Sequence, residues 1–245
     1  MANLNTLDVF FSSQTFQEEE LRKKIVVVID VLRASSTIIT ALMNQAKGII
    51  PVEDMGEASR ISQSVDSDNL LLCGEKDGVK IEGYDLGNSP LEYSVDRVKD
   101  KTLIFNTTNG TKAIKKAVGS SNLYIGSFLN LSTIVHTLNE EQKDIVLICA
   151  GWRGRMAIED LLFAGNVIYN LGNGTLPHEA RDGSKVAFGL YEKFRENISD
   201  VIHRSNHAER LKEIAGDQDL DYCAQRDICD ILPVLNDGII TNLYG

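Results

Sequence analysis

The sequence predicts an α/β protein in which helices cover the faces of a mixed or mostly parallel β-sheet. Two observations favour this class. Short apolar runs of strand length recur along the 245 residues, and several of them lead through a polar turn into a segment with helical periodicity. The pattern also suggests a structural division near Thr137, into an N-terminal α/β half, residues 1–136, and a C-terminal α/β half, residues 137–245.

The expected elements follow from these runs in chain order. Seven apolar runs are predicted strands: Leu7–Phe11, Ile25–Ile29, Gly48–Val52, Leu70–Cys73, Thr102–Phe105, Leu123–Ile125 and Ile145–Cys149. The helical segments are Ser36–Gln45, Thr111–Val118, Leu131–Glu141, Met156–Asn170, Lys185–Glu196, His207–Ala215 and Tyr222–Ile228, followed by an apolar tail near Ile231–Val234. In such sheets, ligands bind at the carboxyl ends of the strands, so the polar strand ends are the first candidates for a site.

Composition limits the classes of partner. The formal net charge is -10 and the basic residues form no continuous run, which argues against nucleic-acid and anionic-membrane surfaces. No apolar run approaches the ~18 residues of a membrane span. The four cysteines lack zinc-site spacing and disulfide density, which favours reduced thiols and a cytoplasmic location. A small anionic metabolite remains a suitable partner, and the sequence leaves a homo-oligomer open.

Asp30 is the strongest single candidate for chemistry. It directly follows the predicted strand Ile25–Ile29, so the fold presents its carboxylate at the sheet edge. Oxygen ligands suit Mg²⁺, which commonly takes one or two carboxylates and keeps several waters. The structural alternative is that Asp30 only caps the following helix.

The residues after Asp30 favour anion binding. Arg33 supplies a positive charge, and Ser35, Ser36 and Thr37 supply hydroxyl and backbone N–H groups at a helix start. An ion pair between Arg33 and Asp30 is the structural alternative.

A second strand end repeats this pattern without a charge. Thr107, Thr108, Asn109, Gly110 and Thr111 follow Thr102–Phe105, and their amides and hydroxyls are suited to an anion at a helix start. Asn-Gly is equally common in plain turns. The segment that contains Asn88 is likewise a turn first and a candidate ligand loop second.

Acidic residues near two other strand ends complete the candidate set. Glu159 and Asp160 begin the helix after the Ile145–Cys149 strand, where they could complete a cation site with Asp30 or position a water. Neighbours on a helix point ~100° apart, so one of them could instead complement the helix dipole. Glu75 is a similar strand-end acid.

Two patterns suggest covalent catalysis and are incomplete. Cys149 through Arg155 fits the cysteine-x5-arginine pattern of thiol phosphatases, but Met156 stands where Ser or Thr is usual, and a buried structural cysteine explains Cys149 better. The haloacid-dehalogenase pattern requires a second acid two residues after Asp30, where Leu32 stands. In the helical tail, a solvated face is the default, and His207 with Arg210 are minority candidates for substrate contacts.

Ordered motifs recur over most of the chain. They are Asp30-Val31-Leu32-Arg33-Ala34-Ser35-Ser36-Thr37, Gly74-Glu75, Tyr84-Asp85-Leu86-Gly87-Asn88-Ser89-Pro90, Thr107-Thr108-Asn109-Gly110-Thr111, Cys149-Ala150-Gly151, Glu159-Asp160 with Ala164-Gly165, Ser205-Asn206-His207-Ala208-Glu209-Arg210-Leu211, and Cys223-Ala224. Taken together, these segments resemble the 2-phosphosulfolactate phosphatase family. The resemblance implies a three-layer α/β/α architecture with two similar halves as an option, and Mg²⁺-dependent hydrolysis of a phosphomonoester in coenzyme M biosynthesis or related sulfonate metabolism.

The resulting hypothesis assigns a role to each candidate. Asp30 with one or both of Glu159 and Asp160 holds Mg²⁺, while Arg33 and Arg153 neutralise developing charge, and catalysis rests on Asp30, Arg33 and Asp160. The remaining substrate contacts are expected from Ser35, Ser36, Thr37, Asn88, Thr108, Asn109, Gly110 and Thr111. The alternatives are a covalent intermediate on Cys149 or Asp30, and a non-catalytic module that binds a phosphorylated metabolite.

Overall fold

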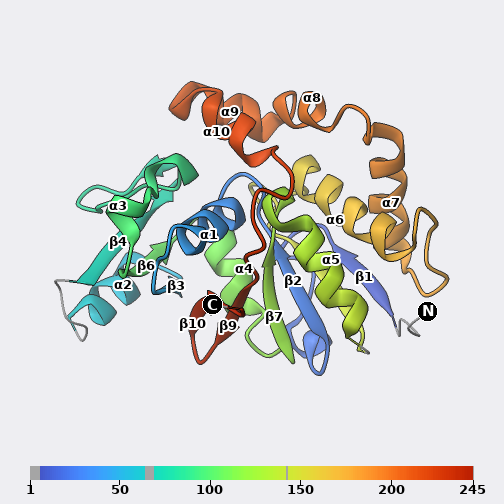
Figure 1. Cartoon of the computed structure of the whole chain (residues 1–245), viewed down its shortest axis with the longest axis horizontal. Helices are drawn as coiled ribbons and strands as arrows, with labels where there is room; N and C mark the ends of the chain where they lie inside the picture. Colours follow the sequence, from blue (N-terminus) through green and yellow to red (C-terminus); the bar gives the residue numbers. More distant parts are fainter. Residues whose placement is uncertain (1–5, 64–68, 142, 245) are drawn as a thin grey trace.

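The computed structural model describes residues 6–63, 69–141 and 143–244, which form a mixed α/β fold (Figure 1). Its strands are β1 (Leu7–Phe10), β2 (Ile25–Ile29), β3 (Gly48–Val52), β4 (Leu70–Lys76), β5 (Val79–Lys80), β6 (Thr102–Asn106), β7 (Asn122–Gly126), β8 (Ile145–Cys149), β9 (Pro233–Asn236) and β10 (Ile239–Asn242). Its helices are α1 (Ala34–Met43), α2 (Met55–Ser62), α3 (Val95–Val98), α4 (Gly110–Lys116), α5 (Leu131–Glu140), α6 (Ile158–Leu171), α7 (Asp182–Phe194), α8 (Ile198–His203), α9 (Asn206–Ala215) and α10 (Gln218–Cys223). Short 3₁₀ turns include η1 (Glu18–Leu21), η3 (Pro90–Glu92) and η4 (Phe128–Asn130).

The sheet consists of two parallel blocks joined by a C-terminal hairpin. The strand order is β1-β8-β2-β7-β9-β10-β3-β6-β4-β5. The strands β1, β8, β2 and β7 are mutually parallel, as are β3, β6 and β4, whereas β9 and β10 pair antiparallel with each other and with their neighbours. The predicted mostly parallel sheet is therefore confirmed.

The sheet bends where the hairpin joins the blocks. Each junction has a single registered pair, Tyr124 with Val234 on one side and Ile240 with Ile49 on the other. Figure 1 shows α1 and α4 between β3, β6 and β4 on one side and β2 and β7 on the other. One core cluster accordingly combines residues of α1 and α4 with alternate residues from both blocks. Both helices are thus enclosed by the protein, which brings the turns that precede them together.

Helices cover both faces of each block, as the α/β/α expectation requires. Residues 25, 27 and 29 of β2 pack against α5, α6 and α7, whereas residues 26 and 28 face α1 and α4. On the second block, Ala58 of α2 packs against Val52 and Ile104, on the face away from α1. A duplication is not shown, because the blocks differ in strand number and β8 from the second predicted half lies between β1 and β2. The predicted boundary at residues 136/137 falls inside α5.

The predicted strands and most predicted helices are present, with differences where the local signal is weak. Helix α2 was not predicted, because it is short, is largely polar and buries only Ala58. The expected helix Tyr222–Ile228 is wrong beyond Cys223. There Asp227 adopts a positive φ of 50°, and the N–H groups of Asp227 and Ile228 donate to carbonyls of η4 instead of continuing a helix.

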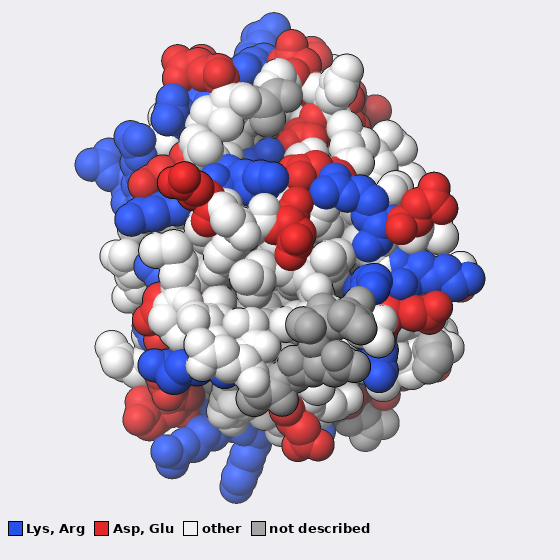
Figure 2. Space-filling model, turned by 90° about the vertical axis from the view of Figure 1, so that its left-hand side faces the viewer, with Lys and Arg blue, Asp and Glu red and all other residues white. Residues whose placement is uncertain are grey.

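The last helices complete the molecule above the sheet. Helices α8, α9 and α10 lie along the top of Figure 1, beyond the beginning of α6. Among the described helices, none is both long and apolar enough to cross a membrane. On the face drawn in Figure 2, basic and acidic groups are interspersed, and no extended surface of one sign is visible.

Candidate active site

A cavity lies where the segments after β2, β4 and β6 meet α9 and the loop after β8. It encloses about 590 Å³ together with the solvent space at its mouth. Both signs of charge face it, so a local field suited to an anion can exist in an acidic protein. Its walls are formed by Asp30, Leu32, Arg33, Glu75, Asp77, Gly78, Asn88, Thr108, Asn109, Trp152, Arg153, His207, Arg210 and Leu211.

Asp30 is held at the cavity by the first turn of α1. Its backbone N–H donates to Ser35 Oγ at 2.9 Å, and its Oδ1 accepts the N–H of Ala34 at 3.4 Å. The pKa of Asp30 is raised to about 6, chiefly by burial and also by the nearby Glu75 and Glu159 carboxylates, whereas His207 and the Ala34 N–H lower it. The protein therefore maintains a carboxylate where its charge is costly, which is common at functional sites.

The start of α4 approaches Asp30 closely. A Cβ atom at Gly110 would lie 2.7 Å from Asp30 Oδ2, so this position accepts only glycine without displacing the carboxylate. Gly110 was predicted to bind substrate, but it does not line the cavity. Its role is to let the start of α4 pack closely against Asp30.

Arg33 lines the cavity, but most of its hydrogen-bonding capacity is used within the protein. Its Nη1 donates to Asp219 Oδ2 at 2.6 Å, its Nη2 donates to the Gly78 carbonyl at 3.0 Å, and both charged side chains are 4% exposed. Asp219 Oδ1 also accepts Ser89 Oγ at 2.6 Å. Arg33 therefore ties α1, the β4–β5 turn and α10 together, and its charge is balanced by Asp219.

Glu75 fixes the loop after β6. Its Oε1 accepts the Thr108 N–H at 2.7 Å, and its Oε2 accepts the Thr108 hydroxyl at 2.9 Å and the Gly78 N–H at 2.6 Å. Asn88, Thr108 and Asn109, which are predicted substrate contacts, line the cavity, although the Thr108 hydroxyl already has a partner in Glu75. Glu75 is thus a positioning residue for two of the segments that form the cavity.

Asp160 lies behind the cavity rather than in its wall. Its Oδ1 accepts the Val31 N–H at 2.9 Å and its Oδ2 accepts the Gly151 N–H at 3.1 Å. Burial, with the neighbouring Glu159 and Asp30 carboxylates, raises the pKa of Asp160 well above its ordinary value. This carboxyl group joins the ends of β2 and β8, which makes it a positioning group at the sheet edge.

Glu159 and His207 form a pair that spans two distant parts of the chain. Glu159 Oε1 lies 2.8 Å from His207 Nδ1, and Glu159 is 1% exposed. Its other oxygen, Oε2, is buried with no hydrogen-bond partner among the described residues. The Trp152 ring stacks on the imidazole with centroids 5.4 Å apart and planes 21° apart. The imidazole is therefore fixed in orientation, and its Nε2 remains for a ligand in the cavity.

Two arginines at the cavity are more exposed than Arg33. The Arg153 guanidinium lies over the Trp152 ring, 4.6 Å from its centroid, on a residue with a positive φ of 52°. Arg210 pairs with Glu213 at 2.8 Å, at the surface of α9. Because exposed pairs contribute little, Arg210 can exchange that partner for a bound anion.

The hydroxyl groups expected to bind substrate are used inside the fold. Ser36 Oγ donates to the Val31 carbonyl, Thr37 Oγ1 to the Asn88 carbonyl and Thr111 Oγ1 to the Thr107 carbonyl. Ser35 Oγ accepts the N–H of Asp30. These four side chains are almost completely buried and do not line the cavity, so they shape its wall. The reason is that α1 and α4 are enclosed by both sheet blocks.

Cys149 is placed unfavourably for catalysis. It is fully buried at the end of β8, within the core cluster between the sheet and α6, and it does not line the cavity. Burial raises the pKa of its thiol well above its ordinary value, so the reactive thiolate is suppressed. The structure thus opposes the thiol-phosphatase alternative.

The carboxylates of Asp30 and Glu159 are suited to bind a cation that has few protein ligands. Within residues 6–63, 69–141 and 143–244, no three His, Cys, Asp or Glu side chains are grouped closely enough to hold one ion. The three expected ligands therefore do not meet as one set, and Asp160 is occupied by backbone N–H groups. Mg²⁺ commonly uses one or two carboxylates with waters and substrate oxygens. Asp30 and Glu159 suit that smaller set, because Glu159 Oε2 is buried and unpartnered.

Comparison with known proteins identifies the family. The profile described as 2-phosphosulpholactate phosphatase matches residues 10–238. This chain belongs to that family. It is 41% identical over 234 residues to the probable 2-phosphosulfolactate phosphatase of Caldanaerobacter subterraneus subsp. tengcongensis, with 96% of this chain and 97% of that protein covered. The probable 2-phosphosulfolactate phosphatases of Clostridium beijerinckii and Pseudothermotoga lettingae are 36% and 38% identical, with 96% and 93% of this chain covered. The resemblance predicted from the sequence is thus confirmed.

Within this 2-phosphosulfolactate phosphatase family member, sequence reasoning underestimated the C-terminal contribution. Asp219 was not predicted, and His207 was only a minority candidate, although both contact residues of the predicted strand ends. Trp152 was not among the predicted site residues. A signal existed in the motif around His207, but its partner Glu159 is 48 residues away, a distance that no local pattern covers.

Proposed function

We propose that this protein hydrolyses 2-phosphosulfolactate to sulfolactate and phosphate with Mg²⁺, as a phosphoric monoester hydrolase. The observation that carries the proposal is a cavity that presents the buried Asp30 carboxylate together with Arg153, Arg210 and His207. The buried Glu159 carboxylate does not line this cavity but contacts His207 in its wall. The printed names of the full-length relatives support the substrate. The proposal includes a cytoplasmic location and a role in coenzyme M biosynthesis or related sulfonate metabolism.

Asp30 and Glu159 are the residues that would hold Mg²⁺. When bound, the ion would stabilise the negative charge of the phosphoryl group and orient its oxygens. Without a cation, burial and mutual repulsion disfavour ionisation of Asp30. Asp160 maintains the position of Asp30 through the backbone of Val31, the next residue.

The basic residues of the cavity would bind the substrate oxygens and supply a proton. Arg153 and Arg210 are suited to the sulfonate, carboxylate and phosphate oxygens, because neither is committed to a buried ion pair. In hydrolysis, a new P–O bond forms to water, and the bond from phosphorus to the sulfolactate oxygen breaks. That oxygen must take a proton, and His207 can supply it from Nε2 while Glu159 stabilises the charged imidazole through Nδ1.

Phosphate release is the measurement that tests the proposal. We would compare 2-phosphosulfolactate with 2-phospholactate, which lacks the sulfonate, each with Mg²⁺ and with EDTA. Preferred, chelator-sensitive release from 2-phosphosulfolactate is the expected result. Chelator-resistant turnover would contradict the role of Mg²⁺ and would favour a covalent intermediate on Cys149 or Asp30, which rapid quenching with labelled substrate would trap. Saturable binding without any release would indicate a non-catalytic module and would overturn the proposal.

A further inference from the structure

A second hollow lies beside the candidate active site, on the other side of Trp152 and His207. It encloses about 1530 Å³ together with the solvent space at its mouth. Its walls come from the loop after β8, the first turn of α6, the end of α7, α8 and the start of α9. We call it the arginine groove, and define it by Arg153, Arg155, Arg204, Met156, Phe194 and Val201.

The charges of the arginine groove are unusual for this protein. None of Arg153, Arg155 and Arg204 forms an ion pair within the part of the chain that the structure describes. The acid in the groove wall, Glu159, is already paired with His207. Three uncompensated cations thus gather on a chain with a formal net charge of -10. Their fields add inside a concave surface, so the groove attracts anions.

Part of the lining of the groove is apolar. Met156 is 58% exposed, and the half-buried side chains of Phe194 and Val201 line the same hollow. The Trp152 ring also lines the groove. An apolar surface of this kind is stabilised by contact with an apolar body, whereas phosphate alone would leave it in water. The combination of apolar side chains and unpaired arginines distinguishes the groove from the active-site cavity, whose walls include three carboxylates, Asp30, Glu75 and Asp77.

We propose that the arginine groove is a binding site for an organic anion that combines an apolar body with a sulfonate, carboxylate or phosphate group. The anionic group contacts Arg155 and Arg204, and the apolar body covers Met156, Phe194 and Val201. Because Trp152, Arg153 and His207 line both hollows, a ligand here touches the wall of the active-site cavity. The inference rests on the groove's charge and shape, and does not depend on the proposed hydrolysis.

A fluorescent aromatic sulfonate, 8-anilinonaphthalene-1-sulfonate, has the required chemistry and is the probe of choice. Trp152 is the only tryptophan of the chain, so excitation of tryptophan followed by emission from the bound probe reports proximity to the groove. We expect saturable energy transfer from Trp152 at constant ionic strength. The signal should persist with excess inorganic phosphate and Mg²⁺, which compete for the active-site cavity.

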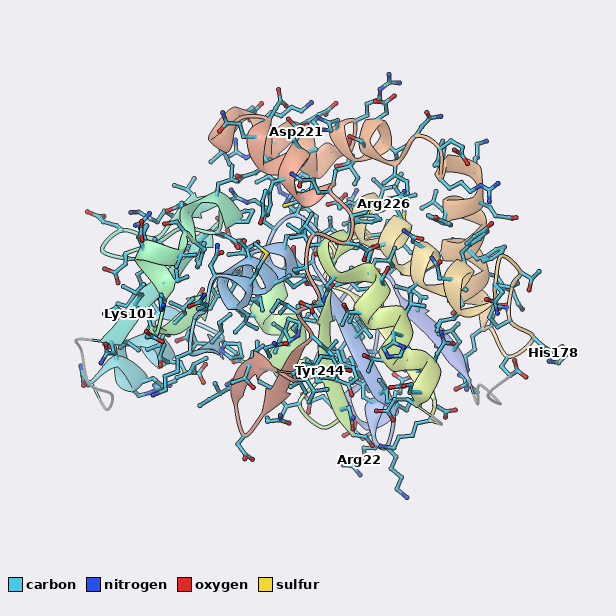
Figure 3. All side chains as sticks on the ribbon, in the orientation of Figure 1. Arg22, Lys101, His178, Asp221, Arg226 and Tyr244 are labelled. Carbon is cyan, nitrogen blue, oxygen red and sulfur yellow. The ribbon has the colours of Figure 1, made fainter. Side chains whose placement is uncertain are left out.

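Two groove variants and one matched control make the test decisive. Arg155→Gln and Arg204→Gln remove exposed, unpaired charges, and each should weaken probe binding about threefold, with about tenfold in the double variant. Arg22→Gln removes the same charge at the opposite end of the molecule from α8 and α9 (Figure 3) and should leave binding unchanged. Circular dichroism confirms that each variant is folded.

Four outcomes would overturn the proposal. They are absence of saturable energy transfer, equal affinity in the groove variants and wild type, displacement of the probe by phosphate, and coverage of the groove by another copy. Sedimentation velocity at the same protein concentrations detects association of the chain. If another copy covers the groove, the probe signal will fall as the associated fraction rises.

Discussion

The active-site cavity and the arginine groove share a wall of Trp152, Arg153 and His207, but their charges differ. Both signs of charge face the cavity, whereas the unpaired charges of the groove are cationic. The cavity collects the buried carboxylates of Asp30 and Glu75, and burial makes the charge of Asp30 costly. The groove collects exposed cations around apolar side chains. The difference teaches that the buried charged groups of this protein have fixed partners, so they position neighbouring segments or can bind a cation. The exposed arginines have no such partners and remain available to an anion from solution.

The same contrast separates Arg33 from Arg153. Arg33 has a short, buried contact with Asp219, while Arg153 lies exposed over an aromatic ring. The same guanidinium group thus has different roles at the two positions, because a buried charge requires an oppositely charged partner and an exposed charge does not. The following variants test that distinction, beginning with the largest expected effect.

Replacement of the Asp30 carboxylate should greatly reduce turnover with little change in the fold. Asp30→Asn retains an oxygen for the N–H of Ala34 but loses the charge, so we expect kcat to fall about a thousandfold. Asp100→Asn is the control, because Asp100 is exposed and its positive φ of 60° suits asparagine. A fully active, metal-independent Asp30→Asn enzyme would contradict the assigned role.

Loss of the buried ion pair should cost stability. Arg33→Gln leaves Asp219 buried without its cation, so the free energy of unfolding should fall by about 3–5 kcal/mol in urea titrations. Arg60→Gln, on exposed α2 surface, should change it by less than about 0.5 kcal/mol. Unchanged stability with lost activity would instead place Arg33 among the substrate contacts.

The imidazole should matter for kcat more than for KM. His207→Gln removes the proton carried by Nε2, and a loss of about a hundredfold in kcat follows from general acid catalysis. A leaving group of low pKa needs no proton, so aryl phosphates should lose much less. An equal loss with both kinds of substrate would show that His207 only supports Trp152 or Glu159.

Ionisation of Asp30 should destabilise the metal-free protein. Its folded-state pKa of about 6 exceeds the ordinary value of 3.8, so its stabilising contribution is complete below pH 4 and is lost as the pH rises through 6. In EDTA, wild type should therefore lose roughly 3 kcal/mol relative to Asp30→Asn between pH 4 and pH 7. Parallel stability profiles for the two proteins would refute the buried-charge interpretation.

The smallest effect is expected at the exposed cation. Arg153→Gln should raise KM about fivefold and change kcat little, since a surface cation contributes about 1 kcal/mol to anion binding. Arg22→Gln again serves as the control. A kcat effect as large as that of Asp30→Asn would mean that Arg153 stabilises the transition state.

Much of this site was predictable from local patterns. The strand Ile25–Ile29 and the acid that follows it were read from an apolar run and its polar end, and Asn88, Thr108 and Asn109 reach the cavity as expected. The hydroxyls of Ser35, Ser36 and Thr37 were misplaced for a physical reason. Their helix is enclosed between two sheet blocks, so polar residues that read as a ligand loop became internal hydrogen-bonding groups.

The sequence by itself therefore determined the elements, the strand-end acids and the family, because apolar periodicity and ordered motifs are local properties. Only the tertiary structure decided which charged side chains are paired within the protein and which are available to a ligand. Arg33 meets Asp219 across 186 positions, and Glu159 meets His207 across 48. Such pairs depend on how distant helices pack over the sheet, and no local spacing encodes that packing.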